Sequence, residues 1–277
     1  MPIRLIAIDL DGTLLNSSNE ISGENTQALT AAHQAGAEVV VVTGRRFHSA
    51  RPFVEQIPFP VTVISSNGAR IGSTAGEVHY RNFLPAEMAR RVLELAIKFR
   101  PYAVAIFDRP GAGQVMMQVG ASHQGPLAWY LRNNPDCLGL VPDLHAAIAE
   151  DPVHVTFGGP PSTLEPLEAA LRQSPCAAEV HLTWTKYLTR NVSLLDVMNR
   201  GCSKGSALAF WSAHQSIPSH DVMAIGDNHN DLEMLEFAGC GVMMANCSAD
   251  LNDGRWLRTF SNDQHGVAEA IRRYVFQ

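Results

Sequence analysis

The stretch Leu5–Leu15, with the sequence LIAIDLDGTLL, decides the fold, because an apolar run ends in it at two carboxylates spaced i, i+2. The run Ile3–Ile8 is short, apolar and partly β-branched, which predicts a buried strand of a parallel sheet. On a strand, Asp9 and Asp11 point to the same face and repel each other, so water, a metal ion or a cationic side chain must relieve the repulsion. Gly12 then permits a tight turn whose backbone N–H groups can face an anion. Ligands of open α/β sheets bind outside the carboxyl ends of the strands, so we expect the chemistry at these two aspartates.

The bulk composition limits the class of protein. The chain has 277 residues, 46% of them hydrophobic, which is enough for one large or two modest domains. A formal charge of −6 argues against nucleic acid or an anionic membrane as a partner, since both attract basic faces. The five cysteines are dispersed without a C-x-x-C pair, which predicts no zinc site, no disulfide framework and a reducing, cytoplasmic location. No signal peptide is visible, and the apolar runs are too short to span a bilayer.

A second unit of strand and helix follows the first. Ser22 can cap a helix that Gly36 ends, and the apolar run 37–42 reads as the next buried strand, which completes a βαβ unit. Thr43 and Gly44 come directly after this strand. A hydroxyl and an exposed backbone N–H at the start of a helix make a cradle for phosphate, so both residues are candidates for phosphate binding.

The features after this cradle are less specific. Arg45 could be a functional cation or an ordinary solvated side chain of the first helical turn. We expect the following helix to break at Pro52 and a third strand to cover Val61–Ser65. The turn Asn67-Gly68-Ala69 could be a plain turn or a contact with substrate.

The pattern changes in the middle of the chain. Strands adjacent in sequence and joined by short turns predict an antiparallel α+β module there. Three helices are expected. The first begins at Pro85 and runs to Ile97, the second lies around Leu127–Leu131, and the third covers Leu164–Leu171. The expected strands are Tyr102–Phe107, Gln114–Val119, Val153–Phe157, Val180–Thr185 and Leu188–Val197. We therefore predict a domain at residues 83–197, inserted into a core formed by residues 1–82 and 198–277.

A lysine occupies an unusual position where the chain returns to the core. Ser203 can cap the helix that follows, which places Lys204 in its first turn, where the helix dipole disfavours a cation. Such a placement suggests a task, such as holding a phosphate and the acid that attacks it.

A second acidic strand end lies at Val222–Gly226. The acids Asp227 and Asp231 follow this apolar strand, and hard oxygen ligands of this kind suit Mg²⁺. We expect Asp227 to bind the metal directly, and Asp231 to act through a water molecule or from behind the direct ligands. Asn230 is a candidate donor to a substrate phosphate. His229 is a poor candidate, because imidazole matches Mg²⁺ badly.

Four segments, taken in order, resemble the motifs of one superfamily. These are D-L-D-G-T-L-L at 9–15, T-G-R at 43–45, S-K-G-x-A-L at 203–208 and G-D-x-x-N-D at 226–231. Together they resemble the haloacid dehalogenase (HAD) superfamily. The long insertion after Thr43 resembles the C2-type cap of its Cof-type (IIB) branch. The resemblance implies an α/β fold, with a Rossmann-like parallel sheet, helices on both faces and an inserted α+β cap domain. Family members usually show glycine near Ala245 and alanine near Cys247, so the chain departs from the family in that loop.

The resemblance also implies roles for the motif residues. Asp9 would be the nucleophile, and Asp11 the general acid and base. Mg²⁺ would be held by the Asp9 side chain, the Asp11 backbone carbonyl and Asp227. The groups that neutralise the phosphoryl charge would be Lys204, the Thr43 hydroxyl and the amides of Gly12 and Gly44. The implied reaction is Mg²⁺-dependent hydrolysis of a small phosphate monoester, such as a sugar phosphate or a phosphorylated cofactor or metabolite, through an aspartyl-phosphate.

Three alternatives remain open at the level of sequence. A phosphomutase or phosphotransferase would pass the phosphoryl group to a sugar hydroxyl. A signalling receiver domain also carries a phosphorylatable aspartate, but it needs no acid at Asp11 and no inserted domain. A binding protein on the same scaffold would be catalytically silent. The cap candidates for substrate contact are His181, Lys186 and Arg190, and the sequence predicts no oligomeric state.

Overall fold

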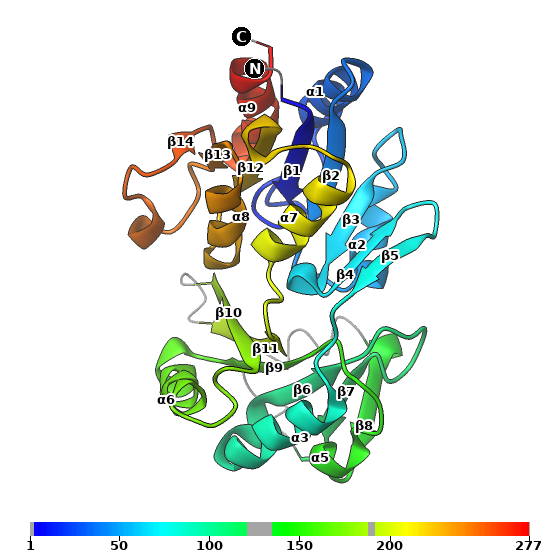
Figure 1. The fold of residues 1–277 in the computed structure, drawn as a ribbon, viewed down its shortest axis with the longest axis vertical. Helices are drawn as coiled ribbons and strands as arrows, with labels where there is room; N and C mark the ends of the chain where they lie inside the picture. The colour runs from blue at the N-terminus through cyan, green and yellow to red at the C-terminus, as the bar shows by residue number, and fades with distance from the viewer. Residues whose placement is uncertain (1–2, 121–134, 188–191, 277) are drawn as a thin grey trace. The chain divides into compact units, whose positions relative to one another are not determined.

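A computed structural model describes residues 3–120, 135–187 and 192–276 of the chain (Figure 1). The chain divides into two compact units. The core unit comprises Met1–Arg81 and Ser203–Gln277, and the cap unit comprises Asn82–Cys202. The sequence placed the second boundary between residues 197 and 198. That point lies inside strand β11 (Val192–Asn199), so the cap unit continues a few residues further.

The core unit is built on an eight-stranded sheet with the order β14-β13-β12-β1-β2-β3-β4-β5. The strands are β1 (Leu5–Asp9), β2 (Glu38–Val42), β3 (Thr62–Ser65), β4 (Arg70–Ser73), β5 (Val78–Arg81), β12 (Val222–Gly226), β13 (Cys240–Met243) and β14 (Leu257–Arg258). Strand β1 lies between β12 and β2 and pairs with both in parallel. The first motif therefore occupies the middle of the sheet.

Helices cover both faces of this sheet. They are α1 (Gly23–Gln34), α2 (Phe47–Val54), α7 (Lys204–His214), α8 (Leu232–Phe237) and α9 (Gly266–Tyr274). Alternate residues of β1 enter two separate cores, because Ile6 packs on the side of α1, α2 and α9 and Ala7 packs on the side of α7 and α8. A strand buried on both faces reads as a continuous apolar run, and for this reason the sequence predicted a parallel sheet. The predicted α/β core is confirmed.

Two helix starts follow the predicted capping, whereas one predicted helix break is wrong. The Ser22 side chain accepts a hydrogen bond from the Asn25 amide at 3.2 Å, and the Ser203 side chain accepts one from the Ser206 amide at 3.1 Å. Pro52, however, lies inside α2 without ending it. The helix continues to Val54, whose side chain is fully buried, so packing outweighs the hydrogen bond that proline removes.

The sheet also contains an antiparallel extension that the sequence did not predict. Strands β4 and β5 continue the sheet beyond β3, and a short 3₁₀ turn η1 (Ser66–Gly68) joins β3 to β4. Gly68 has φ +103°, and a Cβ there would collide with the Ser203 carbonyl oxygen. The turn can therefore approach the start of α7 only with glycine at this position.

The cap unit has a six-stranded sheet with the order β10-β11-β9-β6-β7-β8. Its strands are β6 (Ala103–Ile106), β7 (Val115–Gln118), β8 (Leu138–Val141), β9 (His154–Gly159), β10 (Val180–Tyr187) and β11. Among the described residues, its helices are α3 (Ala86–Leu95), α5 (Leu144–Ala147) and α6 (Pro161–Arg172), with a 3₁₀ segment η2 at Ile97–Tyr102. Side chains from these three helices share one apolar core with the sheet, including Leu93, Leu144 and Leu164.

The predicted α+β character of the cap is confirmed, with two additional elements. The sequence missed β8 and α5, and β8 pairs with β7 in parallel, while the other strand pairs of this sheet are antiparallel. The helix expected around Leu127–Leu131 and the start of the strand expected at Leu188 lie outside the described residues. None of the helices in the described ranges is both long and apolar enough to cross a lipid bilayer.

Candidate active site

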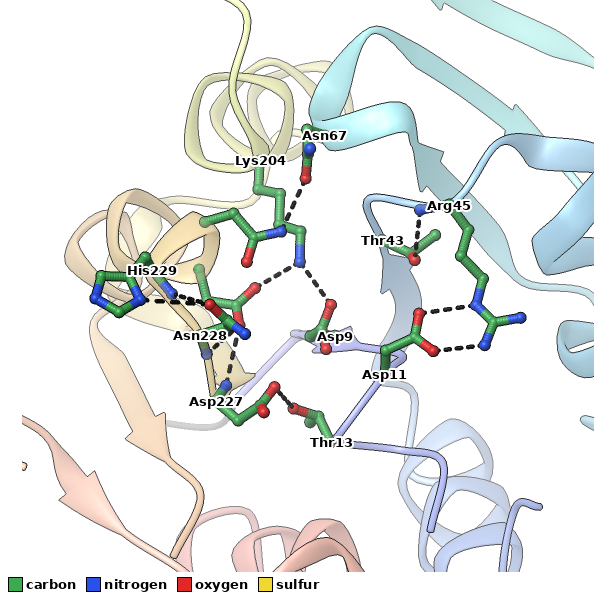
Figure 2. Close-up of polar contacts among 12 residues, drawn as sticks. Asp9, Asp11, Thr13, Thr43, Arg45, Asn67, Lys204, Asp227, Asn228 and His229 are labelled. Carbon is green, nitrogen blue, oxygen red and sulfur yellow. Dashed lines mark hydrogen bonds and ion pairs between the residues drawn. The ribbon is translucent and has the colours of Figure 1, made fainter. Parts of the chain in front are cut away.

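Two neighbouring parallel strands bring the acidic motifs together. Asp9 is the last residue of β1, and Asp227 directly follows β12. The two strands pair residue by residue up to Ile8 and Ile225, so their carboxyl ends lie at the same edge of the sheet. Figure 2 shows the side chains of both acids at this edge, with Lys204 reaching between the motifs.

Lys204 links the nucleophile candidate to the fourth motif. Its Nζ lies 2.5 Å from Oδ1 of Asp9 and 2.6 Å from Oδ1 of Asp231, and its side chain is only 1% exposed. Burial alone would lower the pKa of Lys204, but the two carboxylates outweigh burial and raise this pKa. The ammonium is therefore charged at neutral pH. Two carboxylates compensate for its unfavourable place at the start of α7.

Asp231 is fully buried and has both carboxylate oxygens engaged. Oδ1 contacts Lys204, and Oδ2 accepts hydrogen bonds from the backbone amides of Asp227 at 3.0 Å and Asn228 at 2.9 Å. A Cβ at Gly226 would lie 2.5 Å from the Asp231 Cβ, so the close fit of this loop depends on glycine. This arrangement suits a residue that orients Lys204 and the loop.

Asp9 and Asp227 carry more negative charge than Lys204 alone offsets. Burial raises the pKa of Asp9 well above its usual range, although Lys204 opposes this. Burial, with a further contribution from Asp231, raises the pKa of Asp227 to about 7. Thr13 offsets part of this effect by donating to Oδ1 of Asp227 at 3.1 Å. Two buried carboxyl groups with only one nearby ammonium in the described part of the chain favour the binding of a further cation.

The donor set fits a hard divalent metal ion. One carboxylate oxygen each from Asp9, Asp227 and Asp231 lie within 4.8 Å of one another. Within the described ranges, no side chain or amide donates to Oδ2 of Asp9 or Oδ2 of Asp227. Oxygen ligands from one or two carboxylates are what Mg²⁺ takes in phosphoryl-transfer sites. Asp9 and Asp227 are therefore the side chains best placed to bind it.

Asp11 faces a different partner from Asp9. The Arg45 guanidinium donates to it through Nε at 2.8 Å and Nη2 at 2.5 Å, a two-pronged ion pair that Figure 2 shows beside the Asp9–Lys204 contact. The Phe53 ring lies 4.4 Å beneath the Arg45 guanidinium carbon. The sequence left Arg45 open between function and solvation. The T-G-R spacing was the available signal, but it did not indicate which acid the arginine would contact.

The predicted phosphate cradle lies beside the η1 turn. The Thr43 hydroxyl oxygen accepts a hydrogen bond from the Arg45 amide at 3.0 Å, which leaves its own hydrogen to donate. The Thr43 carbonyl accepts from the Asn67 amide at 3.0 Å. Asn230 donates to the Asn67 side chain at 2.9 Å, and a Cβ at Gly44 would lie 3.1 Å from the same Asn67 oxygen. The fold thus gathers candidates from the second and fourth motifs.

Gly12 and His229 complete the placement of the motif residues. Gly12 has φ +80°, and a Cβ there would collide with the Asp227 carboxylate, so this turn requires glycine. His229 lies 2.7 Å from Oδ2 of Asp250 through its Nε2. Its ring is therefore engaged with the neighbouring loop.

The geometry agrees with comparisons to known proteins. Residues 6–271 match the sequence profile of haloacid dehalogenase-like hydrolases. The chain belongs to this family. The match covers nearly the whole chain, so the superfamily resemblance of the four motifs is confirmed and the protein is a hydrolase of the HAD superfamily.

Three relatives illustrate the likeness of this hydrolase to known members. It is 31% identical to phosphatase YwpJ of Bacillus subtilis over 99% of this chain and 100% of the relative. It is also 31% identical to the HMP-PP phosphatase of Serratia proteamaculans, over 90% of this chain and 86% of the relative. The solved structure of a haloacid dehalogenase-like hydrolase from B. subtilis superposes with a TM-score of 0.79 at 27% identity, covering 98% of this chain and 99% of that one.

Proposed function

We propose that this hydrolase is a Mg²⁺-dependent phosphatase that hydrolyses a small phosphate monoester through an aspartyl-phosphate on Asp9. The observation that carries the proposal is the buried Lys204, shared between Asp9 and Asp231 beside the unneutralised Asp227. A site of this kind supplies a nucleophile, a fixed cation and a place for a metal ion. Both sequence relatives are named as phosphatases, which supports phosphate hydrolysis as the reaction class.

The reaction takes two steps. In the first, an oxygen of the Asp9 carboxylate attacks phosphorus, the bond from phosphorus to the leaving oxygen breaks, and Asp11 gives a proton to that oxygen. In the second, Asp11 takes a proton from water, which attacks the aspartyl-phosphate. The bond between phosphorus and the Asp9 oxygen then breaks, releasing phosphate. In the structure both carboxylate oxygens of Asp11 accept from Arg45, so this ion pair must open before Asp11 can pass a proton to the leaving oxygen.

The negative charge of the phosphoryl group needs several partners. The candidates are the Lys204 ammonium, the Thr43 hydroxyl, the Asn230 side chain and the amides of Gly12 and Gly44. Asp9, Asp227 and the Asp11 backbone carbonyl would hold Mg²⁺. The metal ion, when bound, neutralises charge shared between the nucleophile and the phosphoryl oxygens. Positioning and charge stabilisation are the main needs of phosphoryl transfer.

The cap unit supplies, in this proposal, the contacts that select the organic part of the substrate. His181 and Lys186 both lie on β10, and its unbroken register with β11 places them on opposite faces of the sheet. Lys186 lies over the Trp184 ring, on the face covered by helices, with 5.5 Å between its Nζ and the ring centroid. His181 shares the other face with Thr183. Arg190, the third candidate from the sequence, lies outside the described residues.

The name of one relative supports the proposed substrate class. HMP-PP phosphatase is named for a small phosphorylated metabolite. We extend that class, and not that compound, to the present chain. Phosphoryl transfer to a sugar hydroxyl remains the competing outcome, and products that appear as new sugar phosphates when sugar acceptors are added would show it.

The decisive experiment uses Asp11→Asn with two leaving groups. A nitrophenoxide leaves without a proton, whereas a sugar alkoxide needs one. Phosphorylation of Asp9 should therefore slow far more with a sugar phosphate than with nitrophenyl phosphate. Hydrolysis of the intermediate has lost its base and should be slow with either substrate. Rapid quench should show a burst of nitrophenol and accumulating aspartyl-phosphate. Equal slowing with both substrates and no burst would exclude the acid–base role of Asp11.

A further inference from the structure

The turn that carries Asp11 and Gly12 has few hydrogen bonds of its own. The Leu14 amide donates to the Asp9 carbonyl at 3.2 Å and the Leu15 amide to the Leu10 carbonyl at 2.9 Å, which closes the turn at its base. Neither bond restrains the peptide between Gly12 and Thr13. Since Gly12 has φ +80° and glycine populates many conformations, this peptide keeps one orientation only with restraints from outside the turn. One such restraint is the Thr13 hydroxyl, which donates to Oδ1 of Asp227 at 3.1 Å.

Three asparagines donate to carbonyls of the turn, and Asn246 is the one that restrains this peptide directly. The Asn246 side chain donates to the Gly12 carbonyl at 2.8 Å, Asn25 to the Leu14 carbonyl at 3.4 Å, and Asn262 to the Leu15 carbonyl at 2.9 Å. We call Asn25, Asn246 and Asn262 the asparagine clamp. They come from α1, from the loop after β13, and from the 3₁₀ segment η8 (Asn262–Gln264).

The amides of the clamp are themselves held in one orientation. The Asn246 side-chain oxygen accepts from the Asn262 backbone amide at 3.0 Å, so its NH₂ group must face Gly12. The Asn25 side-chain oxygen accepts from the Ala268 amide of α9 at 3.0 Å. Helices α1 and α9 pack against each other, as Figure 1 shows, so the clamp is tied to the rigid core.

A carboxylate extends the same attachment to the end of the turn. Asp263 accepts from the Ser17 amide at 2.8 Å and from the Ser17 hydroxyl at 2.7 Å. All these contacts lie within the core unit, and most join residues more than 230 positions apart in sequence. The C-terminal segment therefore shapes the turn that follows the nucleophile.

We propose that the asparagine clamp consists of positioning residues that fix the turn bearing Asp11 and Gly12 in its catalytic conformation. The proposal rests on the proposed function, because the clamped turn bears the acid–base residue Asp11 and the Gly12 amide. A trans peptide points its C=O and N–H in opposite directions. Holding the Gly12 carbonyl on Asn246 therefore also fixes the direction of the Thr13 amide. Misplacement by about 1 Å is enough to lower a rate on the order of a hundredfold.

The test uses Asn246 first, because its side chain is exposed and its replacement should leave the fold intact. Asn246→Asp keeps the acceptor and removes the donor, and Asn246→Ala removes both without adding charge. We expect each to lower kcat for nitrophenyl phosphate by about tenfold, with KM within about threefold. Asn252→Asp, at an exposed residue outside the clamp, controls for added negative charge and should keep kcat.

A second readout does not depend on activity. Hydrogen–deuterium exchange over residues 10–18 should be faster in both Asn246 variants than in the parent, with exchange in β1 and β12 unchanged. Asn262→Asp should show the same pattern more strongly, since Asn262 is only 8% exposed. If that variant fails to fold by circular dichroism, the two Asn246 variants decide.

The outcomes separate the two proposals. A parent protein without turnover on any phosphate would contradict the proposed function, and unchanged exchange over residues 10–18 would independently contradict the clamp. Faster exchange with kcat within twofold of the parent would overturn the catalytic role of the clamp. Faster exchange with a reduced kcat and a steady KM would support it.

Discussion

The two sheets of this hydrolase carry their buried polar residues in different places. In the core sheet they gather at the carboxyl ends of parallel strands, as Asp9 does on β1. In the cap sheet several lie inside strands, where Thr183, Asp196 and Thr156 form one row across β10, β11 and β9, although His154 begins β9. Within this row, the Thr156 hydroxyl donates to Asp196 at 2.6 Å.

The difference follows from how each sheet is covered. A parallel sheet with helices on both faces buries every side chain along its strands, so reactive groups can only stand at the strand ends. The cap sheet packs its helices against the face that carries Phe157 and Leu195, and the alternate residues of the same strands form a second face. This second face is buried as well, and it carries Val104 and Ile106 beside the polar row. We propose that the core carries the common chemistry and that the cap selects the substrate.

The largest expected effect is that of Asp9→Asn, which should lower kcat on every phosphate by at least about a thousandfold, because an amide cannot attack phosphorus. Steady-state kinetics with Mg²⁺ present measures this loss. The matched control is Asp221→Asn. Asp221 is also a buried aspartate of the core, but it stands just before β12, at the opposite end of that strand from Asp227. If the Asp9 variant turned over substrate nearly as fast as the parent, Asp9 would not be the nucleophile.

The next effect concerns stability at the same strand end. Lys204→Met leaves Asp9 and Asp231 buried without their shared cation, which should lower the free energy of unfolding by about 3–5 kcal/mol at pH 8. At pH 5 the loss should be smaller, because the raised pKa of Asp9 lets that carboxyl take up a proton. Urea unfolding of the metal-free protein at both pH values measures the difference. Equal destabilisation at both would assign the effect to lost packing.

A smaller effect is expected from pH alone. Folding raises the pKa of Asp227 from 3.8 to about 7, so between these values the folded state binds more protons than the unfolded state. The stability of the metal-free protein should therefore fall as pH rises from about 4 to about 7. Asp227→Asn should flatten this slope, and Mg²⁺ should stabilise the parent more at pH 8 than at pH 5. Chemical denaturation across this range, with and without Mg²⁺, tests both statements.

The sequence predicted what depends on local order and could not predict what depends on distant contacts. Strand β1, the cap of α7 by Ser203 and the acids at two strand ends follow from short stretches with a strong pattern. The Arg45–Asp11 ion pair depends on how two loops meet, and T-G-R gives no direction for the arginine.

Other features were hidden because long-range packing decides them. Pro52 remains helical because its neighbours in α2 are buried, which outweighs a local rule. The contacts of Asn246 and Asn262 could not be predicted, because their partners lie at the other end of the chain. The parallel pairing of β8 with β7 could not be predicted, because nothing in the sequence pattern indicates that these two strands are neighbours.

The smallest expected effect tests the two faces of the cap sheet directly. Thr183 and Ser193 each bury a hydroxyl oxygen that has no hydrogen-bond partner within the described part of the chain. Thr183 stands opposite Asp196 on the second face. Ser193 and Leu195 both lie on the face covered by helices. Thr183→Val and Ser193→Ala each remove one hydroxyl with little change in shape. They therefore form a matched pair for the two faces.

If the second face contacts a polar group of the substrate, Thr183→Val should lower kcat/KM for a responsive phosphorylated metabolite by up to about tenfold. The same variant should retain its activity toward nitrophenyl phosphate, which lacks that group. Ser193→Ala should leave the activity toward both substrates unchanged, because Ser193 lies on the face that is filled by apolar side chains. A panel of phosphorylated metabolites, compared across the parent and both variants, gives the measurement. Equal losses on all substrates in the Thr183 variant would mean that this hydroxyl supports the fold, and a shift in preference in the Ser193 variant would contradict the assignment of selection to one face.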